Sequence, residues 1–288
     1  MSNQLLAILS VGDDDSLVPM RSETDVEPSQ YREALLEVLL DALRCRADAD
    51  VLAAFEGGSA ATGRLDRYSD VDLYIVAEAT RFDSLFETIE AALQTFTSIA
   101  HVWPVAPPPW PGFAQKIYLV DGAPQYFMLD CCVLQRQTAQ LFLQPERHGE
   151  ARVLHDPQQL LRAAPFDRPA WSERLRARHS QIGAAFPIYR LLVEKEVERG
   201  HTLDAVAFYQ VILRLFIELA GIVYRPERYD YGWRYLHSDL PLALQQDLVR
   251  WALPASVDSI RFALDEVSTR ISALLALASA QATEPGNE

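Results

Sequence analysis

Three aspartates in otherwise apolar segments are the residues of this chain best suited to chemistry. Asp70 and Asp72 lie two positions apart in "SDVDLYIV", and Asp130 interrupts "QYFMLDCCVL". In a strand, residues two apart project from the same face, so the first two carboxylates would repel each other unless a divalent cation lies between them. Mg²⁺ suits such a site because it prefers hard oxygen ligands and shares them with substrate phosphates. For Asp130 alone, a strand-end acid or an arginine partner is the alternative.

A glycine-serine turn precedes the acidic pair. In "FEGGSAATGRLDRYSDVDLYIV", Gly57 and Gly58 end an apolar run and Ser59 follows directly. The glycines allow a sharp turn and a close approach to a ligand, and Ser59 is predicted to start a helix whose N–H groups and hydroxyl bind phosphate oxygens. "GGS" alone is more often a plain turn. Together with Asp70 and Asp72 it predicts metal-assisted phosphoryl or nucleotidyl transfer.

The order of these residues resembles the signature of the DNA polymerase β type nucleotidyltransferase superfamily: Gly58-Ser59, ten residues, Asp70-Val71-Asp72, and later an acid in a strand. Within it, the segment "GGSAATGRLDRYSDVDLYIV" is most similar to the small-molecule antibiotic nucleotidyltransferases, the lincosamide enzymes first and the aminoglycoside enzymes more distantly. Two further segments resemble the same enzymes. These are "ARVLHDPQQLL", like their strand and turn that leave the catalytic domain, and "ERGHTLDAVAFYQVILRLFIELAGIVY", like their C-terminal helix.

The resemblance implies a role for each motif residue. Asp70 and Asp72 would bind Mg²⁺, and Gly58 and Ser59 would hold the triphosphate. Asp130 would be a metal ligand, the general base for the acceptor hydroxyl, or both by turns. The implied reaction transfers a nucleoside monophosphate, AMP from ATP in the expected case, to a hydroxyl of a small molecule such as a lincosamide or aminoglycoside antibiotic, and releases pyrophosphate.

One departure from the family leaves the base open. Some lincosamide-type enzymes carry a further glutamate several residues past the strand aspartate, where this chain has "QRQ" at 135–137. Two other functions therefore remain as alternatives. The acceptor would be a protein or a tRNA end, as in toxin-antitoxin nucleotidyltransferases, or the chain would be a catalytically silent nucleotide-binding protein.

The elements that must position these residues follow from hydrophobic periodicity, which changes along the chain. The first part predicts a helix from Ser29 and then short strand-type runs with one amphipathic helix among them. The predicted strands are "DVLAAFEGG", "DVDLYIVA", "SIAHVWPV", "FAQKIYLVDG" and "PQYFMLDCCVL", and the helix is "FDSLFETIEAALQTF". The second part has helical patterns at roughly 172–199, 202–223, 240–253 and 256–280.

The predicted fold class is therefore α+β, with an N-terminal mixed sheet and flanking helices followed by a C-terminal helical bundle. Residues 1–28 are predicted to be a leader, because they are acidic, polar and contain prolines. Residues 29–165 are predicted to form the catalytic domain, and 166–288 a helical domain that closes on substrate and nucleotide.

Other charged and aromatic residues allow two interpretations each. Lys195 and Arg199 lie one helical turn apart and are predicted either to clamp the triphosphate or to make ordinary charge pairs with neighbouring glutamates. Arg64 and Arg67 are predicted to face water rather than phosphate. The aromatic residues within 224–241 are predicted to pack a helix connection, with a stacking wall for a sugar or nucleobase as the alternative.

Composition limits the partners. The 288 residues carry a formal net charge of −14, which disfavours nucleic acids and anionic membranes and suits a cationic acceptor. Cys45, Cys131 and Cys132 lack metal or redox spacing, and free thiols predict a reducing, cytoplasmic location. We expect no membrane span, because no uncharged apolar run of about 18 residues is present. The sequence does not decide whether the protein forms a homodimer.

Overall fold

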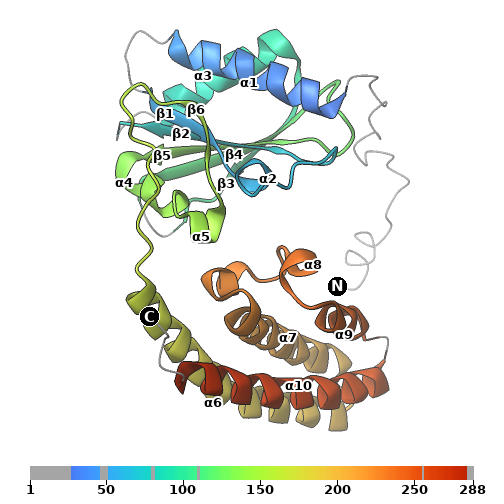
Figure 1. Cartoon of the computed structure of the whole chain (residues 1–288). Helices are drawn as coiled ribbons and strands as arrows, with labels where there is room; N and C mark the ends of the chain where they lie inside the picture. The colour runs from blue at the N-terminus through green and yellow to red at the C-terminus, as the bar shows by residue number, and fades with distance from the viewer. Residues whose placement is uncertain (1–26, 46–50, 79–81, 109–110, 255, 284–288) are drawn as a thin grey trace, which may run out of the picture. The chain divides into compact units, whose positions relative to one another are not determined.

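A computed structural model describes residues 27–45, 51–78, 82–108, 111–254 and 256–283 of the chain. The chain divides into two compact units, of which the first ends at Pro165 and the second begins at Phe166. Each unit has its own hydrophobic core and is described by itself (Figure 1). Of the predicted leader, residues 1–26 lie outside the described residues.

Unit 1 contains a six-stranded mixed sheet in the order β3-β4-β5-β2-β1-β6, so the mixed sheet predicted from the sequence is confirmed. Strands β2 and β5 run parallel, and the other neighbouring strands run antiparallel. The strands are β1 (Val51–Glu56), β2 (Val71–Ala77), β3 (Ile99–Val105), β4 (Phe113–Val120), β5 (Leu129–Gln135) and β6 (Arg152–His155).

Helices cover both faces of this sheet (Figure 1). Helices α1 (Pro28–Arg44) and α3 (Phe82–Phe96) lie on one face, where their leucine and phenylalanine side chains pack against every second residue of the strands. Short elements lie on the other face: α4 (Arg136–Ala139), η2 (Gln140–Phe142) and α5 (Pro145–His148). Helix α1 begins at Pro28, one residue before the predicted Ser29, because proline suits the first helical position.

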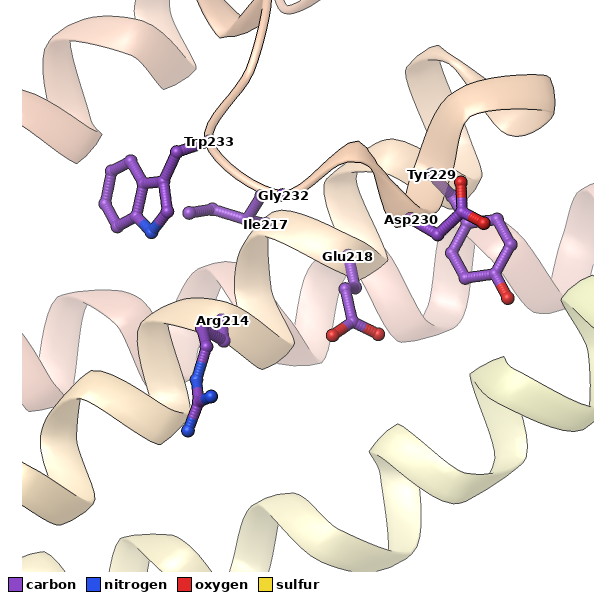
Figure 2. A pocket seen from close by; sticks show the side chains of 7 residues that line it. All are labelled: Arg214, Ile217, Glu218, Tyr229, Asp230, Gly232 and Trp233. Carbon is purple, nitrogen blue, oxygen red and sulfur yellow. The ribbon is translucent and has the colours of Figure 1, made fainter. Parts of the chain in front are cut away.

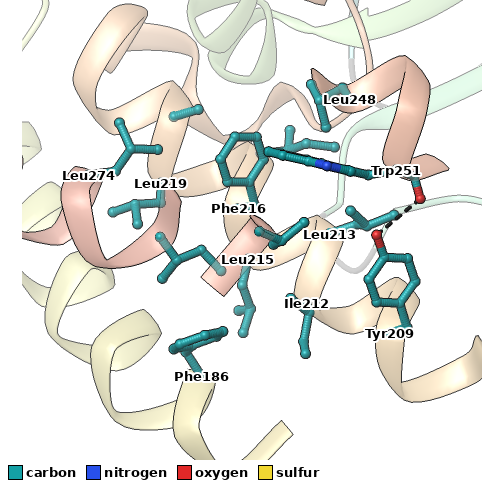
Figure 3. Close-up of a cluster of buried hydrophobic side chains, with 14 of the residues drawn as sticks. Phe186, Tyr209, Ile212, Leu213, Leu215, Phe216, Leu219, Leu248, Trp251 and Leu274 are labelled. Carbon is teal, nitrogen blue, oxygen red and sulfur yellow. Dashed lines mark hydrogen bonds between the residues drawn. The ribbon is translucent and has the colours of Figure 1, made fainter. Parts of the chain in front are cut away.

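Unit 2 is helical, as predicted. It consists of α6 (Arg168–Glu198), α7 (Thr202–Tyr224), η3 (Pro226–Tyr231), α8 (Leu236–Asp239), α9 (Leu242–Ala252) and α10 (Val257–Thr283). Figure 3 shows its core, in which Phe216 and Trp251 meet edge to face with ring centroids 5.3 Å apart. The Tyr209 hydroxyl donates to the Trp251 carbonyl at 3.0 Å, which satisfies a buried polar group inside this core.

Two helix bounds in unit 2 differ from the prediction. Helix α6 begins at Arg168 rather than near residue 172, because the Asp167 side chain accepts a hydrogen bond from the Ala170 N–H at 3.0 Å and caps it. The predicted helix 240–253 is shorter, since α9 starts at Leu242, after Pro241. Both differences arise from capping residues next to the periodic segment.

Helix α7 is, among the described residues, the one helix long and apolar enough to cross a membrane. Its apolar window contains Arg214 and Glu218, so α7 is not an uncharged apolar run of about 18 residues. Half of the apolar window is buried inside the unit, and α7 supplies many of the most buried side chains of its core. Its apolar composition is accounted for by this packing.

Candidate active site

The three predicted aspartates lie at one end of two neighbouring strands. Asp72 is the second residue of β2 and Asp130 the second residue of β5, and the two are paired directly across the parallel ladder. Because register partners project from the same face, both carboxylates leave the sheet on the side opposite α1 and α3. Asp70 directly precedes β2, and its Oδ1 accepts a hydrogen bond of 3.0 Å from the Met128 N–H, next to the start of β5.

The glycine turn lies against one of these carboxylates. Strand β1 ends at Glu56, and the Gly57 N–H donates to the Asp72 carbonyl at 3.0 Å. Gly58 has a φ of +54°, and a Cβ at this position would lie 1.7 Å from Asp72 Oδ2. At Gly57 a Cβ would lie 2.6 Å from Cε2 of Tyr74. The two glycines are therefore required by the close approach of this turn to β2, as well as by the positive φ at Gly58.

The helix expected after the turn is much shorter than a phosphate-binding helix. Element α2 spans Gly58–Ala61, four residues, and begins at Gly58 rather than at Ser59. The predicted helix is therefore present, but its single turn has little macrodipole. Ser59 is half-buried within the turn.

Gln115 on β4 is a site residue that the sequence reasoning missed. Its Nε2 donates to both carboxylate oxygens of Asp130, at 2.7 and 2.8 Å. Because a carboxylate only accepts, the amide nitrogen must face it. These bonds fix the orientation of the Asp130 side chain and favour its ionised form. No local sequence pattern indicates Gln115, because it lies fifteen positions before Asp130 and meets it only through the β4–β5 pairing.

The pKa of Asp70 reflects both its burial and the negative charge of Asp130 nearby. Burial raises the pKa of Asp70, and the charge of Asp130 raises it further, against the Met128 hydrogen bond and the Arg32 guanidinium, which lower it. Burial also raises the pKa of the Cys132 thiol, which lies 3.7 Å from Asp130 Oδ1. A bound cation would relieve the cost of holding these carboxylates ionised.

The donor set fits a hard divalent cation. Asp70, Asp72 and Asp130 are all half-buried and offer carboxylate oxygens at one end of β2 and β5. The glycine turn brings its backbone to the same place without a side chain in the way. Carboxylates beside a backbone turn that can receive phosphate oxygens form the type of site that Mg²⁺ occupies with substrate phosphates. The residues that are present therefore suit Mg²⁺.

Two further basic residues near the motif, Arg64 and Arg67, are exposed. The Arg67 guanidinium lies over the ring of Tyr68, 4.5 Å from its centroid. Arg67 therefore lies against an aromatic side chain at the surface of the loop that precedes Asp70.

Lys195 lies on α6, in unit 2. Its Nζ is 3.5 Å from Glu196 Oε1, and Arg199 reaches the same oxygen at 3.0 Å. These contacts are charge pairs with a neighbouring glutamate, and the predicted role of Lys195 toward the triphosphate stays a prediction. Glu196, His201 and Asp204 also bring ligand atoms within 4.8 Å of one another. Since Glu196 already contacts two basic side chains, this acidic group is compensated without a metal ion.

Unit 2 contains a cavity of about 200 Å³ between α7 and the connection that follows it. Figure 2 shows the seven residues that line it: Arg214, Ile217, Glu218, Tyr229, Asp230, Gly232 and Trp233. Tyr229 is buried and packs against Trp171, with centroids 5.8 Å apart, whereas Trp233 is 48% exposed. The aromatic connection therefore packs the helices, as predicted, and also lines a cavity, while the alternative of a stacking wall for a sugar or nucleobase stays a prediction. Of the two tryptophans in the strand region, Trp103 is exposed on β3, and residue 110 lies outside the described residues.

The chain was compared with protein-family models, curated proteins and solved structures. No protein-family model matches the chain, and no curated protein matches it. Among solved structures, an aminoglycoside 6-adenyltransferase from Bacillus subtilis shares 12% identity, with 88% of this chain and 92% of that chain covered and a TM-score of 0.32. A spectinomycin adenyltransferase from Enterococcus faecialis, with ATP and spectinomycin, shares 13% identity, with 86% and 99% covered and a TM-score of 0.34.

A nucleotidyltransferase-like protein from Exiguobacterium sibiricum shares 10% identity, with 88% of this chain and 76% of that chain covered and a TM-score of 0.36. The first two proteins are named adenyltransferases and the third is named nucleotidyltransferase-like. Since such TM-scores describe a distant likeness, the function of this chain has to rest on the residues of its own site.

Proposed function

We propose that this protein is a nucleotidyltransferase that moves a nucleoside monophosphate, AMP from ATP in the expected case, to a hydroxyl of a small molecule and releases pyrophosphate. The pairing of Asp72 with Asp130 beside the Gly57-Gly58 turn is the observation that carries this proposal. It places metal-binding carboxylates next to a backbone turn that can receive phosphate oxygens.

Asp70, Asp72 and Asp130 would hold Mg²⁺. When bound, the ion would supply positive charge that neutralises charge on the phosphates and on the leaving pyrophosphate. The protein's own part is to keep the carboxylates ionised and in place. The hydrogen bonds from Gln115 to Asp130 and from Met128 N–H to Asp70 do this directly.

The hydrogen bonds that Asp130 accepts support one of the two roles considered for it. Gln115 donates to both of its oxygens, which stabilises the ionised form and weakens the carboxylate as a base. We therefore assign Asp130 first to metal binding and orientation. It can still accept the acceptor's hydroxyl proton where geometry places that hydroxyl next to it.

The acceptor is proposed to be a small cationic compound with hydroxyl groups, such as an aminoglycoside or a lincosamide. The net charge of −14 attracts cations. We also propose a cytoplasmic location, because ATP is available there and the three cysteines are free.

Labelled ATP tests the proposal. The protein is incubated with α-labelled ATP, Mg²⁺ and a panel of aminoglycosides, lincosamides, proteins and tRNA, and both label transfer and pyrophosphate are measured. We expect label in a small molecule and its loss in Asp72→Asn. The matched control is Asp83→Asn, which changes an exposed aspartate at the start of α3 in the same unit.

Other outcomes reassign the function. Label in a protein or in tRNA would mean that the acceptor is a macromolecule. Nucleotide binding without any label or pyrophosphate would fit a catalytically silent nucleotide-binding protein. Unchanged turnover in Asp72→Asn would contradict the assignment of the site.

A further inference from the structure

A buried ion pair lies behind the candidate active site, on the α1 side of the sheet. Arg32 on α1 is 3% exposed and Glu56, the last residue of β1, is fully buried. The Arg32 guanidinium pairs with the Glu56 carboxylate and also donates to two backbone carbonyls, those of Asp70 and of Ser69, the latter at 3.3 Å. One guanidinium therefore contacts the end of β1 and the residues just before β2.

The end of β1 and the residues just before β2 both lead directly into the candidate site. Glu56 directly precedes the Gly57-Gly58 turn, and Asp70 is the first of the predicted metal-binding aspartates. Glu56 pairs in register with Leu73, so its side chain projects toward α1 while Asp72, one residue earlier on β2, projects to the opposite face. Arg32 thus contacts the backbone of the site from the face opposite the carboxylates.

The stability of the fold does not by itself explain this ion pair. Removing two charges from water costs several kcal/mol for each ion, and buried pairs are often no more stabilising than apolar residues of the same size. In agreement, burial raises the pKa of Glu56, against the lowering influence of the Arg32 and Arg152 guanidinium groups. What an apolar pair of side chains could not provide is the set of hydrogen bonds to the Ser69 and Asp70 carbonyls.

We propose that Arg32 is a positioning residue, which fixes the Asp70 backbone relative to the Glu56-Gly57 junction so that the carboxylates and the glycine turn keep the spacing that a metal-nucleotide complex requires. This inference rests on the proposed function of the site. Lysine cannot replace arginine here, because a single ammonium group cannot span a carboxylate and two carbonyls with the fixed fork of a guanidinium.

The same network supplies a matched control. Arg152 on β6 contacts Glu56 Oε2 at 3.1 Å and pairs with Glu33 through two bonds of 2.6 and 2.7 Å. Its side chain is 39% exposed. Arg152→Lys therefore alters the outer part of the network and leaves Arg32 bonded to the backbone before β2.

The test measures metal binding rather than turnover. Mn²⁺ is titrated into the full-length protein with a non-hydrolysable ATP analogue, and bound Mn²⁺ is followed by electron paramagnetic resonance, normalised to the folded fraction from circular dichroism. For Arg32→Lys we expect Mn²⁺ affinity to fall by at least about 10-fold, the range for residues that orient metal ligands. For Arg152→Lys we expect affinity within about twofold of wild type, because exposed pairs contribute little.

A folded Arg32→Lys protein with wild-type Mn²⁺ affinity would overturn the proposal, as would an equal loss in Arg152→Lys. If Arg32→Lys does not fold, the double variant Arg32→Met and Glu56→Gln removes both charges, and we expect it to fold with weakened Mn²⁺ binding. Wild-type affinity in the double variant, or failure of both variants to fold, would reject a positioning role. Absence of Mn²⁺-nucleotide binding in the wild-type protein, or its persistence in Asp72→Asn, would instead reject the proposed function.

Discussion

Asp72 on β2 and Asp130 on β5 are register partners in a parallel strand pair, so their carboxylates project side by side from one face of the sheet. Their positions in the chain are far apart, and the parallel ladder alone makes them neighbours. Placing two acids opposite each other is unfavourable in the absence of a cation. This relationship is therefore the main physical reason to expect a divalent ion here.

We expect Asp130→Asn to lower kcat for pyrophosphate release by about 100-fold or more, because the amide removes a negative ligand while keeping its shape. Mg²⁺ with ATP should raise the melting temperature of the wild-type protein and not that of the variant. Differential scanning fluorimetry and a coupled pyrophosphate assay measure both effects. A variant with kcat within a few fold of wild type would exclude Asp130 from the site.

Gly58→Ala should reduce both stability and activity. The positive φ alone costs roughly 1–2 kcal/mol for a residue with a Cβ, and here the new methyl group would also displace the Asp72 carboxylate, since it would lie only 1.7 Å from Oδ2. Gly63→Ala is the control, because Gly63 has a similar φ of +66° but an added Cβ there meets nothing within 4 Å. Urea unfolding measures the loss of stability, and kcat measures the loss of activity. Gly63→Ala should lose stability only. Equal activity in the two variants would contradict the close approach of the turn to Asp72.

Gln115→Ala should lower kcat by roughly 10- to 100-fold and raise the Mg²⁺ concentration needed for half-maximal rate, because Asp130 loses the two hydrogen bonds that orient it. Gln137→Ala changes an exposed glutamine of the "QRQ" segment on α4 and should leave both values near wild type. The measurement is the initial rate against Mg²⁺ concentration. A larger effect at Gln137 than at Gln115 would show that Gln115 is not the residue that supports Asp130.

Stabilisation by a divalent cation should depend on pH through Asp70. Burial raises the pKa of this carboxyl above its ordinary value of 3.8, so the metal-free folded protein retains the proton to higher pH than the unfolded chain does. Ionisation of Asp70 then lowers the stability of the metal-free fold as pH rises, and a bound cation removes that cost. We expect metal-free stability, compared with that of a variant without this carboxylate, to fall as pH rises above 3.8, and the Mn²⁺-induced rise in melting temperature to be absent at low pH.

The matching variant for this pH profile is Asp70→Asn. At neutral pH it should lower the Mn²⁺-induced rise in melting temperature and should not lower metal-free stability. A metal-free stability difference between the two proteins that does not change as pH rises above 3.8 would show that Asp70 is not perturbed as the structure indicates.

Thiol reactivity should distinguish the three cysteines. Cys45 is exposed, whereas Cys131 and Cys132 are buried and burial raises the pKa of each thiol. A raised thiol pKa keeps the group protonated and unreactive at pH 8. We expect an aromatic disulfide reagent to modify one thiol quickly in the folded protein and all three in denaturant. Disappearance of the fast phase in Cys45→Ser would confirm the assignment, and rapid modification of Cys132 would show that the sheet beneath Asp130 opens.

Local sequence determined a large part of this protein. The spacing of Gly58, Ser59, Asp70 and Asp72 depends on a turn and the start of one strand. Asp72 lies in β2 whereas Asp70 directly precedes it, so the predicted alternation within one strand does not by itself place Asp70. Apolar periodicity likewise predicts the sheet region and the helical region, because burial of one face depends on residues close together in the chain. The helix predicted at Ser59 is present, but it starts at Gly58 and ends after a single turn.

Tertiary structure decided what completes the site. Asp130 faces Asp72 only because β5 pairs with β2, Gln115 reaches Asp130 only through the pairing of β4 with β5, and Arg32 reaches the Asp70 carbonyl only because α1 packs on that face of the sheet. Strand order and helix placement depend on contacts between segments distant in sequence, and no local preference of these residues encodes them.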